Sequence, residues 1–191
     1  MNPRIREAVS AVPDPELAGV TIGELGMIAA VSTVAFGPVE RSSNGHRGLE
    51  SGVGAEYASV DRTLLVELTP TFLGCPALDL IAADVAHAVA SIDRSVRVDV
   101  RFVAWPIWTP DRISDVGRER LAARGIAVPD RDGRARCPFC GAEQLSSVAR
   151  AGPTSCRSVA WCCTCRNVVE LMRRAEGPVA VSILPRPYVH V

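Results

Sequence analysis

The chain has 191 residues, 48% of them hydrophobic, and a formal net charge of zero. This charge balance, without any basic tract, argues against a nucleic-acid-binding protein, which normally carries a positive patch. No apolar run approaches the roughly 18 residues of a membrane span, and the N-terminal residues lack the apolar core of a secretory signal, so we expect a cytoplasmic protein.

The first third of the chain predicts a short helix, a strand and a long loop. Asn2 is a candidate N-cap, and Pro3 occupies the favoured first helical position. Residues 27–36 are apolar and rich in β-branched side chains, which favours a strand. Residues 37–60 are dense in Gly, Ser and charge and show no periodicity, so we expect a mobile loop.

The middle of the chain alternates strands with helices. Residues 61–70 predict a strand that ends at Pro70, and the helical spacing of apolar residues from Pro76 to Ile92 predicts an amphipathic helix. Residues 96–102 alternate apolar and charged side chains, as a half-buried strand does. A second amphipathic helix, ending at Gly125, is predicted from its apolar residues Ile113, Val116 and Leu121.

This order of elements, α-β-β-α-β-α, predicts a small α/β sandwich followed by a second unit. We expect the α/β domain to span residues 1–129, with a linker over residues 125–136. The cysteine-rich unit would then cover residues 130–175, and residues 176–191 would form a C-terminal extension.

Cys75 stands alone in the first two thirds of the chain, directly before Pro76. Because proline is favoured in the first turn of a helix, the pattern places Cys75 at or beside the N-cap. Unpaired backbone N–H groups and the helix dipole would stabilise a thiolate there, so we expect an ionised, accessible sulfur. The alternative is a small buried hydrophobe that packs the corner between strand and helix.

Two acidic residues, Asp14 and Glu16, lie in a turn-like segment near the N-terminus. They are interpreted either as turn and cap residues or as hard oxygen ligands beside the soft sulfur of Cys75. Mixed oxygen and sulfur ligation would suit transient iron binding.

Two Cys-x-x-Cys pairs, separated by residues 141–161, predict a zinc ribbon: Cys137, Cys140, Cys162 and Cys165. Four thiolates leave no open position, so the metal would be structural. A rubredoxin-like iron site would use the same ligands. Cys156 and Cys163 are expected to be bystanders.

With these motifs the chain resembles the PaaD family, also called PaaJ, the accessory component encoded with a multicomponent phenylacetyl-CoA oxygenase in aerobic phenylacetate degradation. Its N-terminal two thirds are similar to the iron–sulfur assembly domain shared with SufT-type proteins. The resemblance is carried by "VPDPELAGVTIGELGMI", "LTPTFLGCPALDLIAADV", "WPIWTPDRISDVGRERLAARGIAVP", "CPFCG", "PTSC" and the second cysteine pair.

The resemblance implies a non-catalytic factor that assists maturation or repair of metal centres, including the iron–sulfur cluster of the oxygenase reductase. Cys75 matches the domain cysteine of the family, and Asp14 and Glu16 match its acidic turn. The implied cofactors are structural zinc and a transient iron ion or iron–sulfur cluster. The implied partners are oxygenase and reductase subunits or iron–sulfur assembly proteins.

Two other functions stay open. A thiol oxidoreductase could use Cys75 with Cys156 or Cys163 as the resolving thiol, although a Cys-x-x-Cys pair at the helix start is missing. An adaptor could bind a protein through the ribbon alone with Cys75 inert, and zero net charge disfavours a nucleic-acid partner for it.

Overall fold

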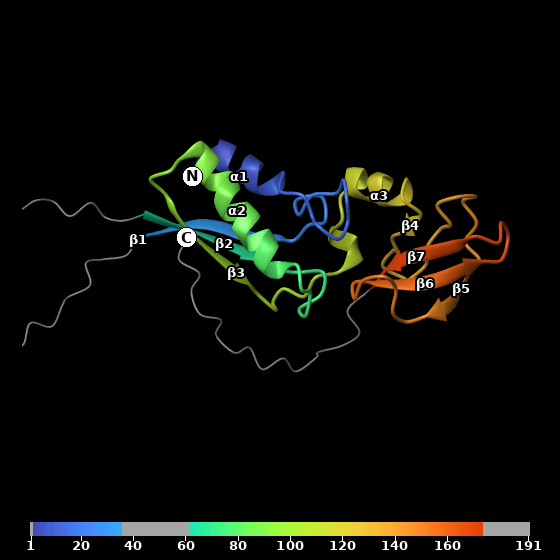
Figure 1. The fold of residues 1–191 in the computed structure, drawn as a ribbon. Coiled ribbons are helices and arrows are strands. Elements are labelled where there is room, and N and C mark those ends of the chain that lie inside the picture. Colours follow the sequence, from blue (N-terminus) through green and yellow to red (C-terminus); the bar gives the residue numbers. More distant parts are fainter. Residues whose placement is uncertain (1, 36–61, 174–191) are drawn as a thin grey trace, which may run out of the picture.

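The computed structural model describes residues 2–35 and 62–173, which form two β-sheets and the helices around them (Figure 1). The predicted loop at 37–60 and the predicted extension at 176–191 lie outside these ranges. No helix within them is both long and apolar enough to cross a membrane.

The N-terminal helix α1 (Pro3–Ser10) begins as its sequence predicts. The side chain of Asn2 accepts a hydrogen bond from the backbone N–H of Arg4 at 3.0 Å, which satisfies one of the unpaired donors of the first turn. Ile5 and Val9 are the buried residues of this helix and belong to the main hydrophobic core.

The first sheet contains β1 (Ile28–Ala35), β2 (Arg62–Leu68) and β3 (Arg97–Phe102), in that order. β1 and β2 are antiparallel, whereas β2 and β3 are parallel, and α2 (Leu78–Ile92) forms the crossover that a parallel pair requires. Helices α1 and α2 lie on one side of this sheet (Figure 1). Because β2 and β3 are parallel, the chain leaves both strands at the same edge of the sheet.

The last helix of the α/β unit differs from the prediction. A 3₁₀ turn, η1 (Pro110–Arg112), precedes α3 (Asp115–Ala122), whose N-cap Ser114 accepts a hydrogen bond from the backbone N–H of Gly117 at 3.1 Å. Ile113 is buried but lies before the helix, Val116 is exposed, and Leu121 is the one residue of the predicted apolar face that is both helical and buried. The predicted order of elements is nevertheless confirmed.

The second sheet has the order β4-β7-β6-β5. Its strands are β4 (Ile126–Ala127), β5 (Leu145–Ala149), β6 (Arg157–Cys162) and β7 (Val168–Met172). The prediction of a linker over residues 125–136 is wrong in part. Ile126 and Ala127 form β4, which pairs in parallel with β7 and extends the sheet. The predicted domain limits stay a prediction, but Ile126 and Met172 are buried in the same cluster as the α/β core.

Candidate metal centres

The sulfur atoms of Cys137, Cys140, Cys162 and Cys165 all lie within 4.8 Å of one another. The Sγ atoms of Cys137 and Cys165 are 3.6 Å apart, as are those of Cys140 and Cys162. A tetrahedral zinc ion with Zn–S bonds of about 2.3 Å would separate its sulfurs by about 3.8 Å. The four cysteines therefore fit zinc in both donor type and spacing.

Two similar turns present these cysteines. The backbone N–H of Gly141 donates to the carbonyl of Cys137 at 2.8 Å, and that of Arg166 donates to the carbonyl of Cys162 at 2.9 Å. Gly141 and Arg166 both have positive φ, +74° and +56°. Glycine adopts this conformation without steric cost, whereas arginine rarely does, so the second turn retains its shape against the local preference of its residue.

The four thiols perturb one another. Backbone and side-chain N–H groups of Asn167 lower the pKa of Cys165 to about 6. The backbone N–H of Ala142 also acts to lower the pKa of Cys140, but burial and hydrogen bonds to the neighbouring sulfurs raise it to about 12. One sulfur is thus stabilised as a thiolate while its neighbour stays protonated, and a bound cation would allow both to ionise.

Cys75 lies further from the helix than the sequence predicts. The N-cap of α2 is Ala77, so Pro76 belongs to the turn before the helix and Cys75 precedes the N-cap by two residues. The backbone N–H of Ala77 still points at the sulfur, with an N···Sγ distance of 3.4 Å. The Cys75 side chain is partly exposed, so the alternative of a sealed core residue is not what the structure shows.

The expectation of an ionised sulfur at Cys75 is wrong. Burial raises its pKa to about 11, and the negative charges of Glu16 and Asp14 act in the same direction. The thiol donates a hydrogen bond to a carboxylate oxygen of Glu16 at 3.4 Å. The single N–H of Ala77 favours the thiolate but is outweighed.

The acidic turn and Cys75 are brought together, although 59 residues separate Glu16 from Cys75 in the chain. One carboxylate oxygen of Asp14 accepts the backbone N–H groups of Glu16 and Leu17, both at 2.8 Å. Asp14 is 6% exposed, and its burial raises its pKa. Asp14 thus does the turn chemistry that the sequence suggested, and it leaves Glu16 to face the sulfur.

The remaining two cysteines lie outside the four-sulfur cluster. Cys163 is exposed, whereas Cys156 is only 4% exposed. The Sγ of Cys156 lies 3.1 Å from the hydroxyl oxygen of Thr154. The sequence left Cys156 as a bystander or a resolving thiol, because a single cysteine carries no spacing signal that would predict its burial.

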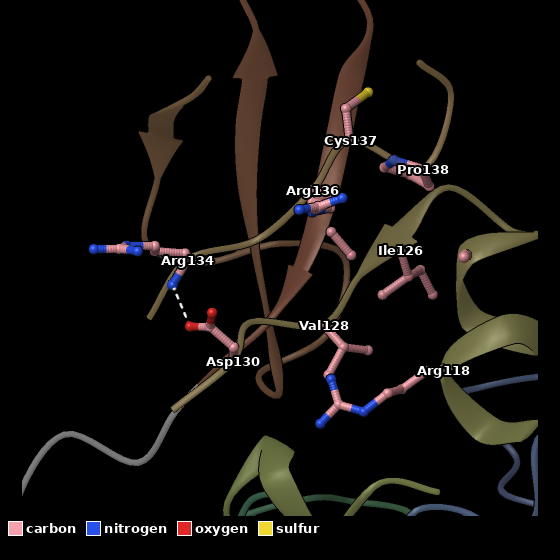
Figure 2. Close-up of a pocket in the computed structure, with 10 residues that line it drawn as sticks. Arg118, Ile126, Val128, Asp130, Arg134, Arg136, Cys137 and Pro138 are labelled. Atoms are coloured by element: carbon pink, nitrogen blue, oxygen red, sulfur yellow. Dashed lines mark hydrogen bonds between the residues drawn. The ribbon is translucent and has the colours of Figure 1, made fainter. Parts of the chain in front are cut away.

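A cavity of about 320 Å³ lies between α3 and the ribbon (Figure 2). Its lining includes Arg118 of α3, Ile126 of β4 and Cys137, and a hydrogen bond from the backbone N–H of Arg134 to Asp130, at 2.8 Å, holds one side. Neither the acidic turn nor Cys75 lines it. The partly exposed thiol therefore lies apart from this cavity.

Comparison with known proteins finds a family match for the ribbon and a relative that covers most of the chain. Residues 124–173 match the family described as the PaaD zinc beta ribbon domain. The chain is 26% identical over 166 residues to an Escherichia coli (strain K12) protein described as one component of a "Putative 1,2-phenylacetyl-CoA epoxidase", and the match covers 83% of this chain and 84% of the relative. The ribbon match and the four-sulfur geometry together identify a structural zinc site.

Two solved structures are also similar. A domain of unknown function, DUF59, from Bacillus anthracis is 24% identical, with a TM-score of 0.45 over 62% of this chain and 89% of that one. A Mycobacterium tuberculosis protein, Rv1466, described as associated with Fe-S complex assembly and repair, is 27% identical, with a TM-score of 0.33 over 64% and 84%. Both TM-scores lie below 0.5.

Proposed function

We propose that this chain, a member of the PaaD/PaaJ family, is an accessory factor that assists assembly or repair of metal centres in a phenylacetyl-CoA-type multicomponent oxygenase. The E. coli relative is described as a component of a phenylacetyl-CoA epoxidase, which supports the choice of client. In this role the chain handles iron or an iron–sulfur cluster as cargo and does not turn over a small substrate.

The observation that carries the proposal is the contact between Cys75 and Glu16. Their 3.4 Å separation joins a soft sulfur to a hard carboxylate oxygen, and iron accepts both kinds of donor. Binding of a cation would displace the thiol proton to solvent, and the two nearby carboxylates would offset part of the positive charge. Because Cys75 is partly exposed and the site has few ligands, iron could be released from it as well as captured.

The cargo must also meet its recipient. Exposed apolar side chains occur on the two segments that leave the common edge of β2 and β3, and at the start of α2: Phe72, Leu73, Leu80, Trp105 and Ile107. Trp105 is 78% exposed. We assign this surface to the client protein that receives the metal, because Cys75 lies in the same segment as Phe72 and transfer requires the thiol to be at the contact.

The direct test is anaerobic iron and cluster reconstitution of the zinc-loaded full chain. We expect Cys75→Ser to lose bound iron and to leave the co-expressed reductase subunit short of its cluster. Cys163→Ser, which alters an exposed cysteine outside the zinc set, is the matched control and should behave as the parent chain does. Undiminished iron binding together with normal client maturation in Cys75→Ser would contradict the proposal.

The thiol states disfavour the oxidoreductase alternative. Burial raises the pKa of Cys75 to about 11 and also raises that of Cys156, so neither is poised as a nucleophile at neutral pH. The adaptor alternative stays a prediction. It requires Cys75→Ala to leave client maturation intact while Cys137→Ser abolishes it.

A further inference from the structure

The two outer strands of the first sheet differ in charge. β1 forms one lateral edge and β3 the other, and within the described ranges no strand pairs with the outer side of either. β3 carries Arg97, Asp99 and Arg101 among its six residues, whereas none of the eight residues of β1 is charged. Charged side chains on an edge strand discourage a further strand from pairing with it. In the first sheet, β1 is the edge that lacks this protection.

The second half of β1 is the part that could accept another strand. A register shift between Ile28 and Ala30 disturbs the start of β1, whereas residues 31–35 pair with β2 in unbroken register. Residues 32–34 are exposed. In an antiparallel pair, every second residue directs its backbone N–H and C=O away from the partner strand. Residues 31–35 therefore present regularly spaced donors and acceptors on the outer side of the sheet.

The side chains of this segment also suit strand pairing. Val31, Thr33 and Val34 are β-branched, which favours extended backbone, and the segment contains neither proline nor glycine. Val31 packs against the main core and so holds the strand in place. Val34 remains 38% exposed. A further strand would cover this apolar side chain and satisfy the outer backbone groups at the same time.

A second copy of this chain is the occupant that these features suit. In a two-fold pairing, each residue of β1 meets the same segment of its copy, so a charged residue there would be repelled by its own counterpart. The uncharged β1 avoids this repulsion, and it offers no opposite charge to a strongly charged strand of another protein. Because β3 is charged, the pairing would close with two copies and would not extend into a longer assembly.

This pairing would leave the Cys75 site and the client surface free. Since β1 and β2 are antiparallel, Ala35 lies opposite Arg62, the first residue of β2. Phe72 and Cys75 follow Leu68, the last residue of β2, so they lie beyond the other end of the sheet. Each copy would keep its own accessible thiol.

We propose that residues 31–35 pair in antiparallel orientation with the same residues of a second copy, so that the first sheets of two chains join into one continuous sheet. The inference concerns assembly and does not depend on the proposed function. One pair of short strands buries less surface than the roughly 1,200 Å² at the lower limit of standard interfaces. We therefore expect a reversible dimer with a dissociation constant of roughly micromolar order.

The test is sedimentation velocity of the zinc-loaded full chain over a micromolar to millimolar range, with a thiol reductant so that the exposed Cys163 cannot crosslink two chains. The sedimentation coefficient should rise with concentration from that of a monomer to that of a dimer. Val34→Lys places like charges at the paired edge and should raise the dissociation constant at least about tenfold. Val116→Lys, the matched control, adds the same charge at an exposed valine of α3 and should dimerise as the parent chain does.

Hydrogen exchange of the parent chain identifies the paired surface and requires no variant to fold. Amides of residues 31–35 should exchange more slowly at high than at low protein concentration. A monomer at every concentration, or a dimer that forms without this protection or persists unchanged in Val34→Lys, would overturn the proposal. Protection of these amides only after addition of an oxygenase reductase subunit would also overturn it and would assign the edge to the client.

Discussion

The two cysteine sites of this protein differ in how much of the ligand set exists before a metal arrives. The ribbon holds four sulfurs within 4.8 Å of one another on two matched turns. Cys75 offers one protonated thiol, hydrogen-bonded to Glu16 at 3.4 Å. A preassembled set of soft ligands retains its ion, whereas a sparse mixed set must reorganise to bind one. Under the proposed function, this contrast separates a structural metal from a cargo.

The surroundings of the two sites differ in the same sense. The ribbon has a small buried cluster of its own, and two of its members are zinc cysteines, Cys137 and Cys162. The α/β domain has a much larger apolar core with helices packed on its sheet. A domain with a small core folds poorly without a crosslink or a metal. We therefore expect zinc binding to stabilise the ribbon and apolar burial to stabilise the α/β domain.

The strongest test of this contrast is Cys137→Ser, which removes a buried zinc ligand. We expect zinc content to fall and residues of the ribbon to become sensitive to protease and fast in hydrogen exchange. The expected loss is large, because zinc contributes about 10 kcal/mol or more to the folding of small zinc modules. Retention of one tightly bound zinc ion and full exchange protection would show that the four-sulfur set is not the structural centre. Cys163→Ser, at an exposed cysteine, should keep its zinc.

A second test asks whether the two regions stabilise one another. Met172 is 1% exposed and lies in β7, yet it packs in the core of the α/β domain. Met172→Ala should lower the free energy of unfolding by about 2–5 kcal/mol, the usual cost of a cavity of this size. Val168→Ala, at an exposed site in the same strand, should cost far less. If denaturant titrations showed that Met172→Ala costs no more free energy of unfolding than Val168→Ala, the ribbon and the α/β core would be energetically independent.

The sequence predicts elements and ligand sets better than it predicts electrostatics. Asn2 and the crossover helix follow from local capping and apolar spacing, and the zinc cysteines follow from a fixed motif, so these features are encoded within short segments. The same holds for the three strands of the first sheet as elements, although their parallel and antiparallel pairing was not predicted from the sequence. Short strands are harder: β4 has only two residues and exists because β7 offers an edge.

The protonation state of Cys75 illustrates the opposite case. The helix start is a local feature, and it predicts a thiolate. The acidic turn lies 59 residues away, and its charge, together with burial, reverses the local effect. Cys156 is buried directly before β6, which pairs with β7, and Met172 of β7 lies in the main core; no spacing in the sequence reveals this burial.

A third test concerns this acidic control of the thiol. Glu16→Gln removes one negative charge and should lower the pKa of Cys75 from about 11 toward its usual value of 9.0. In a zinc-loaded Cys163→Ser background, alkylation of Cys75 at pH 8 should become about threefold to tenfold faster, since one pKa unit is a tenfold change in thiolate. Glu7→Gln, an exposed change on α1, should leave the rate unaltered.

The sign of the pH effect follows from the same shift. A thiol with a raised pKa in the folded chain favours the protonated state, so its contribution to stability is complete below about pH 9 and is lost as the pH rises through about 11. Glu16→Gln should move the upper limit of that window to lower pH. An alkylation profile of the parent chain centred well below pH 9 would show that the helix start, and not the acidic turn, controls the sulfur.

The smallest expected effect on stability comes from a cysteine-to-serine change at Cys75, the counterpart of Cys137→Ser at the zinc site. Cys75→Ser changes a partly exposed sulfur whose hydrogen bonds, to Glu16 and Ala77, are both 3.4 Å long. The serine hydroxyl can make the same two contacts, so the free energy of unfolding should change by less than about 1 kcal/mol. Zinc content should also stay at the level of the parent chain. A loss as large as that from Cys137→Ser would make Cys75 a structural residue, and the division between retained and transferred metal would then fail, because both sites would be needed for the fold.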